Sequence, residues 1–156
     1  MKKIVVSIIL YIFLSTSVFG HLDHYSKVKY LEYDLFRNND LIGSHKYEFL
    51  RDNENLTVKS VVNFKITKLG IDLYKYFAES EENYEKNVFS SFSSKTIQNK
   101  KEKYVNINLN KDKNKLFIDG SSYKGKADKD IIIGTWWNHE IVQKKAQISA
   151  VSGRII

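Results

Sequence analysis

The amino-acid sequence predicts an all-β domain whose antiparallel strands follow one another as a meander, forming a curved sheet or a partial barrel. Three observations support this prediction. Apolar and polar residues alternate in several segments, short turn-forming segments separate them, and the chain contains no proline. Strands that are joined by short turns usually pair with their neighbours in the chain. We therefore expect about seven strands in chain order, with at most one short helix near residues 138–147.

The longest alternating segment covers residues 56–67, with the sequence LTVKSVVNFKIT. Its even-numbered positions are, with one exception, large and apolar: Leu56, Val58, Ser60, Val62, Phe64 and Ile66. A period of two residues is typical of a strand with one buried face and one solvated face. Such a strand would be roughly 35–40 Å long. Burial of its large apolar side chains would contribute on the order of 8–15 kcal/mol before the entropy cost is counted. It needs a neighbouring strand on both edges.

Alternation on either side of this segment predicts those neighbours. The further expected strands cover residues 31–35, 41–50, 71–78, 88–97, 105–109 and 116–118. Asparagine, aspartate, glycine and charged residues separate them, as expected for tight turns. In the strand over residues 41–50, His45 lies on the same side as Tyr47 and Phe49.

Four segments have weaker patterns. The acidic residues 79–87 could form a loop or a crossing strand, and the polar residues 120–130 are expected to form a long mobile loop. Residues 140–147 are expected to form one or two helical turns, and residues 148–156 to be extended.

The first twenty residues have the pattern of a secretory signal peptide. Lys2 and Lys3 precede an almost unbroken apolar run over residues 4–14, and small or tolerated residues lead to Gly20. Cleavage before His21 is therefore expected, which would leave 136 of the 156 residues as a single β domain, residues 21–156. The apolar run is short for a membrane anchor, which needs roughly 20 residues. We expect export to the periplasm or the cell exterior.

Composition excludes several classes of function. The chain has no cysteine, so disulfides, thiolate chemistry and a lipid-modified cysteine are excluded. Its net charge of +7 comes mostly from scattered lysines, which predict a solvated surface and not a nucleic-acid site. Weak attraction to an anionic lipid or glycan remains open.

Candidate catalytic and metal-binding residues are few. An amino-terminal His21 could chelate copper with His24, His45 or His139, although a terminal histidine without a metal is the expected state. Glu79, Glu81 and Glu82 could supply an acid–base pair, but acidic clusters of this kind are usually only solvated. No known motif for a nucleophile, phosphate, zinc or calcium is present. We expect no cofactor, no metal and no catalytic residue, and an enzyme is the least favoured class.

Aromatic residues supply the candidate ligand contacts. Trp136 and Trp137 are followed by Asn138 and His139, and aromatic surface beside a few polar groups is common in ligand pockets. The alternative interpretation is that these tryptophans fill the end of the sheet as core residues. The residues expected to contact a ligand in a concave sheet are Trp136, Trp137, Tyr74, Tyr76 and His45.

Several local patterns resemble a family of bacterial exported proteins known only as a domain of unknown function. In that family they form an IG-x-H strand, a tyrosine-rich strand, E-x-W, S-x-T and W-N. The matching segments here are DLIGSH (40–45), LGIDLYKY (69–76), ENY (82–84), SKTIQN (94–99), WN (137–138) and SGR (152–154). Tyr84 stands where tryptophan is usual, and Lys100 stands where a turn glycine is usual. Members of the family look longer, so we expect that a C-terminal continuation is missing, and that an unpaired sheet edge favours self-association.

The resemblance implies an exported all-β domain similar to lipocalin-like and lipoprotein-carrier half-barrels, and it implies no known activity. The expected function is non-covalent binding of a lipid or another apolar or amphipathic small molecule in the concave sheet. The alternative is a structural or interaction protein of the cell envelope that has a filled core and no ligand.

Overall fold

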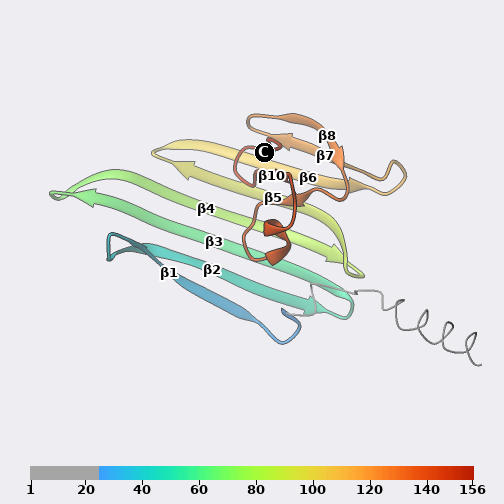
Figure 1. Cartoon of the computed structure of the whole chain (residues 1–156), viewed down its shortest axis with the longest axis horizontal. Helices are drawn as coiled ribbons and strands as arrows, with labels where there is room; N and C mark the ends of the chain where they lie inside the picture. The colour runs from blue at the N-terminus through green and yellow to red at the C-terminus, as the bar shows by residue number, and fades with distance from the viewer. Residues whose placement is uncertain (1–24) are drawn as a thin grey trace, which may run out of the picture.

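The computed structural model describes residues 25–156 and contains one eight-stranded antiparallel sheet with its strands in chain order (Figure 1). The strands are β1 (Tyr30–Arg37), β2 (Asp40–Asp52), β3 (Asn55–Lys68), β4 (Ile71–Glu85), β5 (Val88–Gln98), β6 (Lys101–Asn110), β7 (Lys115–Gly120) and β8 (Lys124–Asp128). The sheet is open, with β1 and β8 at its edges. The predicted all-β meander is therefore confirmed, as a sheet that does not close into a barrel.

Turn residues in the left-handed backbone conformation allow the chain to reverse direction between neighbouring strands within two residues. Both residues of the Asn38-Asn39, Lys86-Asn87 and Asn99-Lys100 turns have positive φ angles. Such turns match the right-handed twist of paired strands, and asparagine tolerates this conformation better than most residues. The polar segments between the alternating runs therefore encode tight hairpins.

Strand β3 lies near the middle of the sheet, as its alternation predicts, and it pairs with β2 and β4 along almost its whole length. Leu56, Val58 and Ser60 are buried, and Val62, Phe64 and Ile66 are partly buried. We call the face that carries these six residues the inner face. The opposite, outer face is mostly polar and exposed, with Lys59, Asn63 and Lys65 on β3.

The last 28 residues cross the inner face, and we call residues 129–156 the cover segment (Figure 1). It contains β9 (Ile132–Ile133), the 3-10 helix η2 (His139–Val142) and β10 (Gln147–Ile148), and β9 pairs with β10 in parallel. The Ser94 hydroxyl donates to the carbonyl of Ala150 at 2.5 Å, which fixes the segment to β5. Gly120 also allows a close approach, because a Cβ atom there would lie 2.7 Å from the Ser152 carbonyl oxygen.

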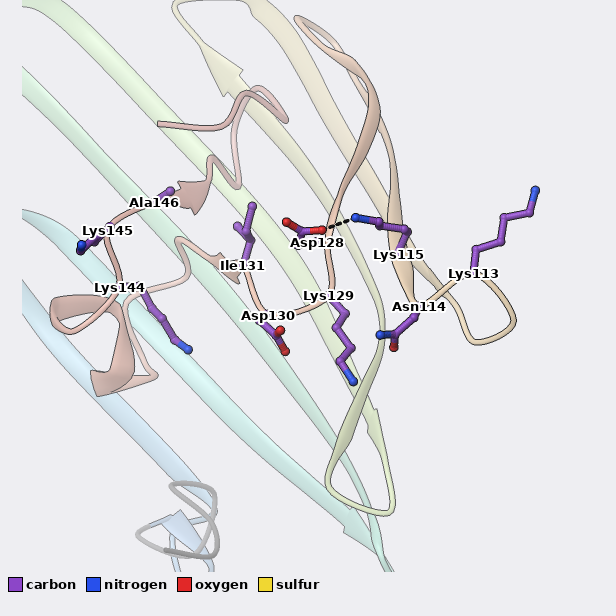
Figure 2. Close-up of a pocket in the computed structure, with 10 residues that line it drawn as sticks. All are labelled: Lys113, Asn114, Lys115, Asp128, Lys129, Asp130, Ile131, Lys144, Lys145 and Ala146. Carbon is purple, nitrogen blue, oxygen red and sulfur yellow. Dashed lines mark hydrogen bonds and ion pairs between the residues drawn. The ribbon is translucent and has the colours of Figure 1, made fainter.

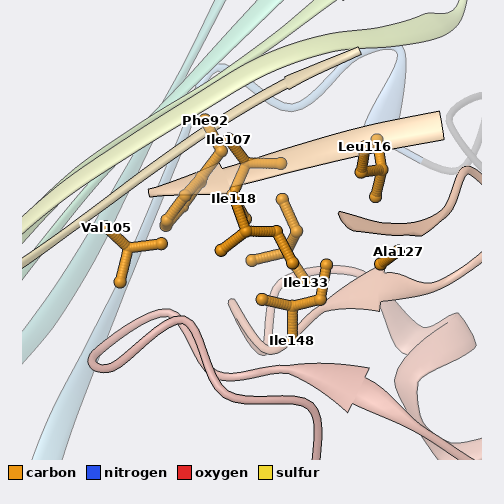
Figure 3. Close-up of a cluster of buried hydrophobic side chains, with 8 residues drawn as sticks. All are labelled: Phe92, Val105, Ile107, Leu116, Ile118, Ala127, Ile133 and Ile148. Atoms are coloured by element: carbon orange, nitrogen blue, oxygen red, sulfur yellow. The ribbon is translucent and has the colours of Figure 1, made fainter. Parts of the chain in front are cut away.

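One apolar cluster lies between β5–β8 and the cover segment (Figure 3). The sheet contributes six of its buried residues and the cover segment two: Phe92, Val105, Ile107, Leu116, Ile118, Ala127, Ile133 and Ile148. Val105, Ile107 and Ile148 have no exposed surface. These side chains bury the half of the inner face that the shorter strands form.

A second, aromatic cluster lies between β2–β4 and the cover segment. Tyr47, Phe49, Leu56 and Val58 pack there with Trp137. The ring of Trp137 lies edge-on to Phe49, with 5.7 Å between the ring centroids. Trp137 is therefore the residue through which the cover segment joins this part of the core.

Four local predictions are settled by the structure. The expected mobile loop over 120–130 is wrong, because residues 124–128 form β8. The acidic residues 79–87 do not form a loop, since β4 continues to Glu85. The expected helical turns over 140–147 are reduced to η2, where the side chain of Asn138 caps the backbone N–H of Glu140. Extended structure over 148–156 is limited to Ile148 and a single bridge from it to Ile155.

The signal peptide prediction concerns residues that lie outside the described part of the chain. No helix within residues 25–156 is long and apolar enough to cross a membrane. Export through a cleaved signal peptide stays a prediction.

Candidate functional site

The inner face continues beyond the cover segment, towards the hairpin that joins β3 and β4 (Figure 1). Three aromatic rings lie on this uncovered part. Phe64 stacks on Tyr76, with ring centroids 5.0 Å apart and planes within 20°, and it lies 5.8 Å from the ring of Tyr74. All three side chains are only partly buried. We call Phe64, Tyr74 and Tyr76 the aromatic stack.

A small cavity of about 90 Å³ lies where the aromatic stack meets the cover segment. Strands β2 to β5 form its floor, and the cover segment forms its other wall through Thr135, Trp136 and Val151. The floor residues are both polar and apolar: His45, Ser60, Val62, Tyr76, Ala78, Glu79, Ser80, Ser94 and Thr96. Most of the exposed cavity surface is apolar, with several polar groups placed in it.

Three of the five predicted ligand residues, His45, Tyr76 and Trp136, line this cavity, and Tyr74 lies beside it in the aromatic stack. Trp137 lies elsewhere, because its side chain is 4% exposed in the aromatic core. Val62 and Phe64 lie at this site as well, although they were not among the predicted ligand residues. Their alternation with Leu56 and Val58 places them on the same face, so the signal was present in the long strand itself.

The two adjacent tryptophans have opposite environments. Trp136 is 71% exposed and has a φ angle of 67°, whereas Trp137 is buried. A bulky residue with positive φ is unusual and costs free energy, of order 1–3 kcal/mol. The bend directs one indole into the core and leaves the other at the rim of the cavity.

A chain of polar contacts begins at the cavity floor. The Nε2 atom of His45 lies 2.9 Å from the Ser60 hydroxyl, and its Nδ1 atom lies 3.4 Å from the Tyr47 hydroxyl. The Tyr47 hydroxyl in turn donates to the backbone carbonyl of Thr135 at 2.8 Å. Burial lowers the pKa of His45 from 6.5 to about 4. The imidazole is therefore neutral at pH 7.

Glu82 forms the second polar centre, between β4 and the cover segment. Its carboxyl group is fully buried and accepts hydrogen bonds from the hydroxyl of Tyr84, the hydroxyl of Thr135 at 3.0 Å and the indole of Trp137 at 2.9 Å. Burial raises the pKa of Glu82, and the three hydrogen bonds partly oppose this effect. Since Thr135 and Trp137 belong to the cover segment, the carboxyl group holds that segment on the sheet.

The three acidic residues considered for an acid–base pair, Glu79, Glu81 and Glu82, do not come together. Glu79 and Glu81 alternate with Glu82 along β4, so they lie on the outer face while Glu82 points inward. No group of three or more histidine, aspartate or glutamate side chains within residues 25–156 is arranged to hold a metal ion. The copper hypothesis depends on His21, which lies outside the described residues.

A family model described as a domain of unknown function, DUF6134, matches residues 33–156. The chain belongs to this family. The match begins within β1 and covers the rest of the sheet and the whole cover segment, so every residue of the cavity lies within the DUF6134 domain. No curated protein and no solved structure matches the chain. This match confirms the predicted resemblance to a domain of unknown function, and it assigns no activity.

The larger hollows of the DUF6134 domain differ in character from the inner-face cavity. One, of about 400 Å³, has lysines and aspartates around its mouth (Figure 2). Lys115 is paired with Asp128 there, and Lys113 projects away from the hollow. Another, of about 440 Å³, lies on the outer face between charged and serine side chains. Neither contains a predicted ligand residue, and charged, serine and asparagine side chains make up most of the residues that line them.

Acid is expected to destabilise the DUF6134 domain partly through His45. The folded-state pKa of about 4 lies below the ordinary 6.5, so the unfolded chain binds a proton more readily between these values. The stabilising contribution is present above pH 6.5 and is lost as the pH falls to about 4. Urea unfolding at a series of pH values should show that the free energy of unfolding decreases less over this window in His45→Gln than in the wild type. An identical decrease in the wild type and in His45→Gln would contradict the assignment of this pH dependence to His45.

Proposed function

We propose that this DUF6134 protein binds an apolar or amphipathic small molecule, such as a lipid chain, on the uncovered part of its inner face. The observation that carries the proposal is the continuity of the aromatic stack with the small cavity under Trp136. Apolar walls with a few placed polar groups are typical of ligand sites in proteins.

The dimensions favour an elongated ligand. Ligand pockets usually enclose roughly 300–1,000 Å³, whereas the cavity here measures about 90 Å³. Only one end of a molecule fits inside. The remainder would lie along Phe64, Tyr74 and Tyr76, where apolar contact with the partly exposed rings would supply most of the binding free energy.

The polar groups favour an uncharged end group. His45 is neutral at pH 7, and the other polar side chains of the strands at the cavity are hydroxyls and one carboxylate: Ser60, Tyr76, Glu79, Ser80, Ser94 and Thr96. None of them carries the positive charge that would compensate a buried carboxylate or phosphate. A hydroxyl, amide or ester is therefore the expected end group in the cavity.

One observation favours the alternative, a structural or interaction protein without a ligand. Beneath the cover segment the interior is filled by Phe92, Trp137 and their neighbours, and the buried carboxyl group of Glu82 accepts three hydrogen bonds. This part of the molecule would serve equally well as a rigid scaffold. The two proposals differ only in whether the uncovered aromatic end binds a small molecule.

Binding can be tested with N-phenyl-1-naphthylamine, an uncharged apolar probe whose fluorescence increases on leaving water. We expect saturable binding by the wild type. Tyr76→Ala should weaken it by about tenfold, the equivalent of about 1.4 kcal/mol of aromatic contact. Tyr104→Ala is the matched control, because Tyr104 lies on the outer face and is 39% exposed.

Two results would contradict the proposal. One is the absence of saturable probe binding by a protein that still unfolds cooperatively. The other is an equal loss of affinity in the Tyr76 and Tyr104 variants, because binding would then be unspecific surface adsorption. Either result would favour the structural alternative.

A further inference from the structure

One end of the sheet exposes large apolar side chains. The β1–β2 and β3–β4 hairpins reverse direction at this end, which we call the hairpin end (Figure 1). Five apolar residues next to these turns are more than half exposed: Phe36 (61%), Leu41 (62%), Leu69 (93%), Ile71 (66%) and Leu73 (56%). Apolar side chains that gather in this way commonly mark a protein or membrane contact.

Leu69 is the least expected of these residues. It occupies the first position of a two-residue turn with a φ angle of 51°, followed by Gly70 at 76°. Turns of this type favour asparagine or aspartate before glycine, and a bulky side chain is costly there. At 93% exposure, Leu69 gains almost no burial in return. Folding therefore gives no reason for leucine at this position, whereas a contact outside the molecule would.

Positive charge surrounds the apolar turn. At this end the β3–β4 hairpin (residues 65–75) and the β5–β6 hairpin (residues 98–103) contain six lysines and two acidic residues, a net charge of +4, whereas in the β1–β2 turn Arg37 and Asp40 cancel. Asp72, one of these acids, is already paired with Lys75 at 2.8 Å. A surface with exposed aliphatic residues and an excess of lysine is complementary to an anionic bilayer.

The opposite end of the sheet provides an internal comparison. Its three turns cover residues 51–54, 85–87 and 111–114, with four basic and four acidic residues. Val88, beside the second of these turns, is the one aliphatic residue next to them that is more than half exposed, at 54%. Several exposed aliphatic residues together with an excess of positive charge therefore distinguish the hairpin end. This combination does not follow from hairpin architecture alone.

We propose that the hairpin end docks reversibly on an anionic lipid bilayer, with Leu69 and Ile71 entering the headgroup region and the surrounding lysines contacting lipid phosphates. The occupant is a lipid surface because the apolar residues lie on projecting turns flanked by lysine. The proposal does not depend on ligand binding in the inner-face cavity. Either one can fail while the other holds.

Vesicle co-sedimentation tests the proposal with the chain from residue 21, which contains every described residue. Vesicles of phosphatidylcholine with about one quarter phosphatidylglycerol should bind it, and pure phosphatidylcholine should bind it far less. High salt should release it. Leu69→Asn combined with Ile71→Thr should lower the partition coefficient by about tenfold or more, since two exposed aliphatic side chains are lost. Lys100→Gln with Lys101→Gln should lower it by about fivefold per lysine.

The apolar variant separates binding from folding. Asparagine suits the left-handed turn better than leucine, so Leu69→Asn should keep or raise the unfolding midpoint. Val142→Asn is the matched control, because Val142 is 83% exposed on the cover segment, away from the hairpin end. Absence of binding to the anionic vesicles would overturn the proposal, as would equal binding by the hairpin and Val142 variants. A change of oligomeric state in the Leu69 variant without vesicle binding would also overturn it, in favour of a protein contact.

Discussion

Trp137→Ala is expected to lower the free energy of unfolding by about 3–5 kcal/mol. Its indole is 4% exposed, lies within 6.0 Å of three aromatic ring centroids and donates a hydrogen bond to Glu82 at 2.9 Å. The substitution creates a cavity and removes a buried hydrogen bond together. Urea unfolding followed by circular dichroism measures the loss.

The neighbouring tryptophan is the control. Trp136 is 71% exposed, so Trp136→Ala should change the stability by no more than about 0.5 kcal/mol. Equal losses in the two variants would mean that the tryptophans do not divide between core and surface as described. The pair thus tests the path of the cover segment directly.

Glu82→Ala is expected to cost about 3 kcal/mol or more, because it leaves three buried donors without an acceptor. The donors are the hydroxyls of Tyr84 and Thr135 and the indole of Trp137. The same loss would detach the cover segment from β4. Amide hydrogen exchange should therefore become faster in residues 129–156 than in β6 and β7.

Two further variants separate burial from charge. Glu79→Ala, on the exposed outer face of the same strand, should change the stability by no more than about 0.5 kcal/mol. Glu82→Gln keeps an acceptor without the buried charge. Because burial raises the folded-state pKa of Glu82, the wild type should lose stability relative to this variant as the pH rises above 4.5. A Glu82→Ala protein as stable as the wild type would contradict this assignment.

The alternation of residues was sufficient to predict most of the sheet, because one face of each long strand packs against a core. It failed at β8, where the inward residues Gly125 and Ala127 are too small to give an apolar signal. It was also ambiguous for the second half of β4. Glu82 is buried there, and the partners that satisfy it, Thr135 and Trp137, lie more than fifty residues later in the chain.

The candidate site was predictable in part for the same reason. His45 and Tyr76 share a face with Phe64 through strand pairing, which follows from alternation. Alternation did not predict that Trp136 is exposed while Trp137 is buried, since this difference depends on the left-handed backbone at Trp136. That bend is set by contacts of the cover segment with the sheet, and no local pattern encodes them.

The proposed binding of a small apolar molecule at the uncovered aromatic end of the inner face can be tested by nuclear magnetic resonance. The chain has two tryptophans, so a nitrogen-15 proton correlation spectrum contains two indole signals that report on the cavity rim and on the core. During titration with N-phenyl-1-naphthylamine, the Trp136 indole signal should shift in a saturable way while the Trp137 signal, hydrogen-bonded to Glu82, stays in place. A titration in which neither signal moves, or in which only the Trp137 signal moves, would contradict the claim.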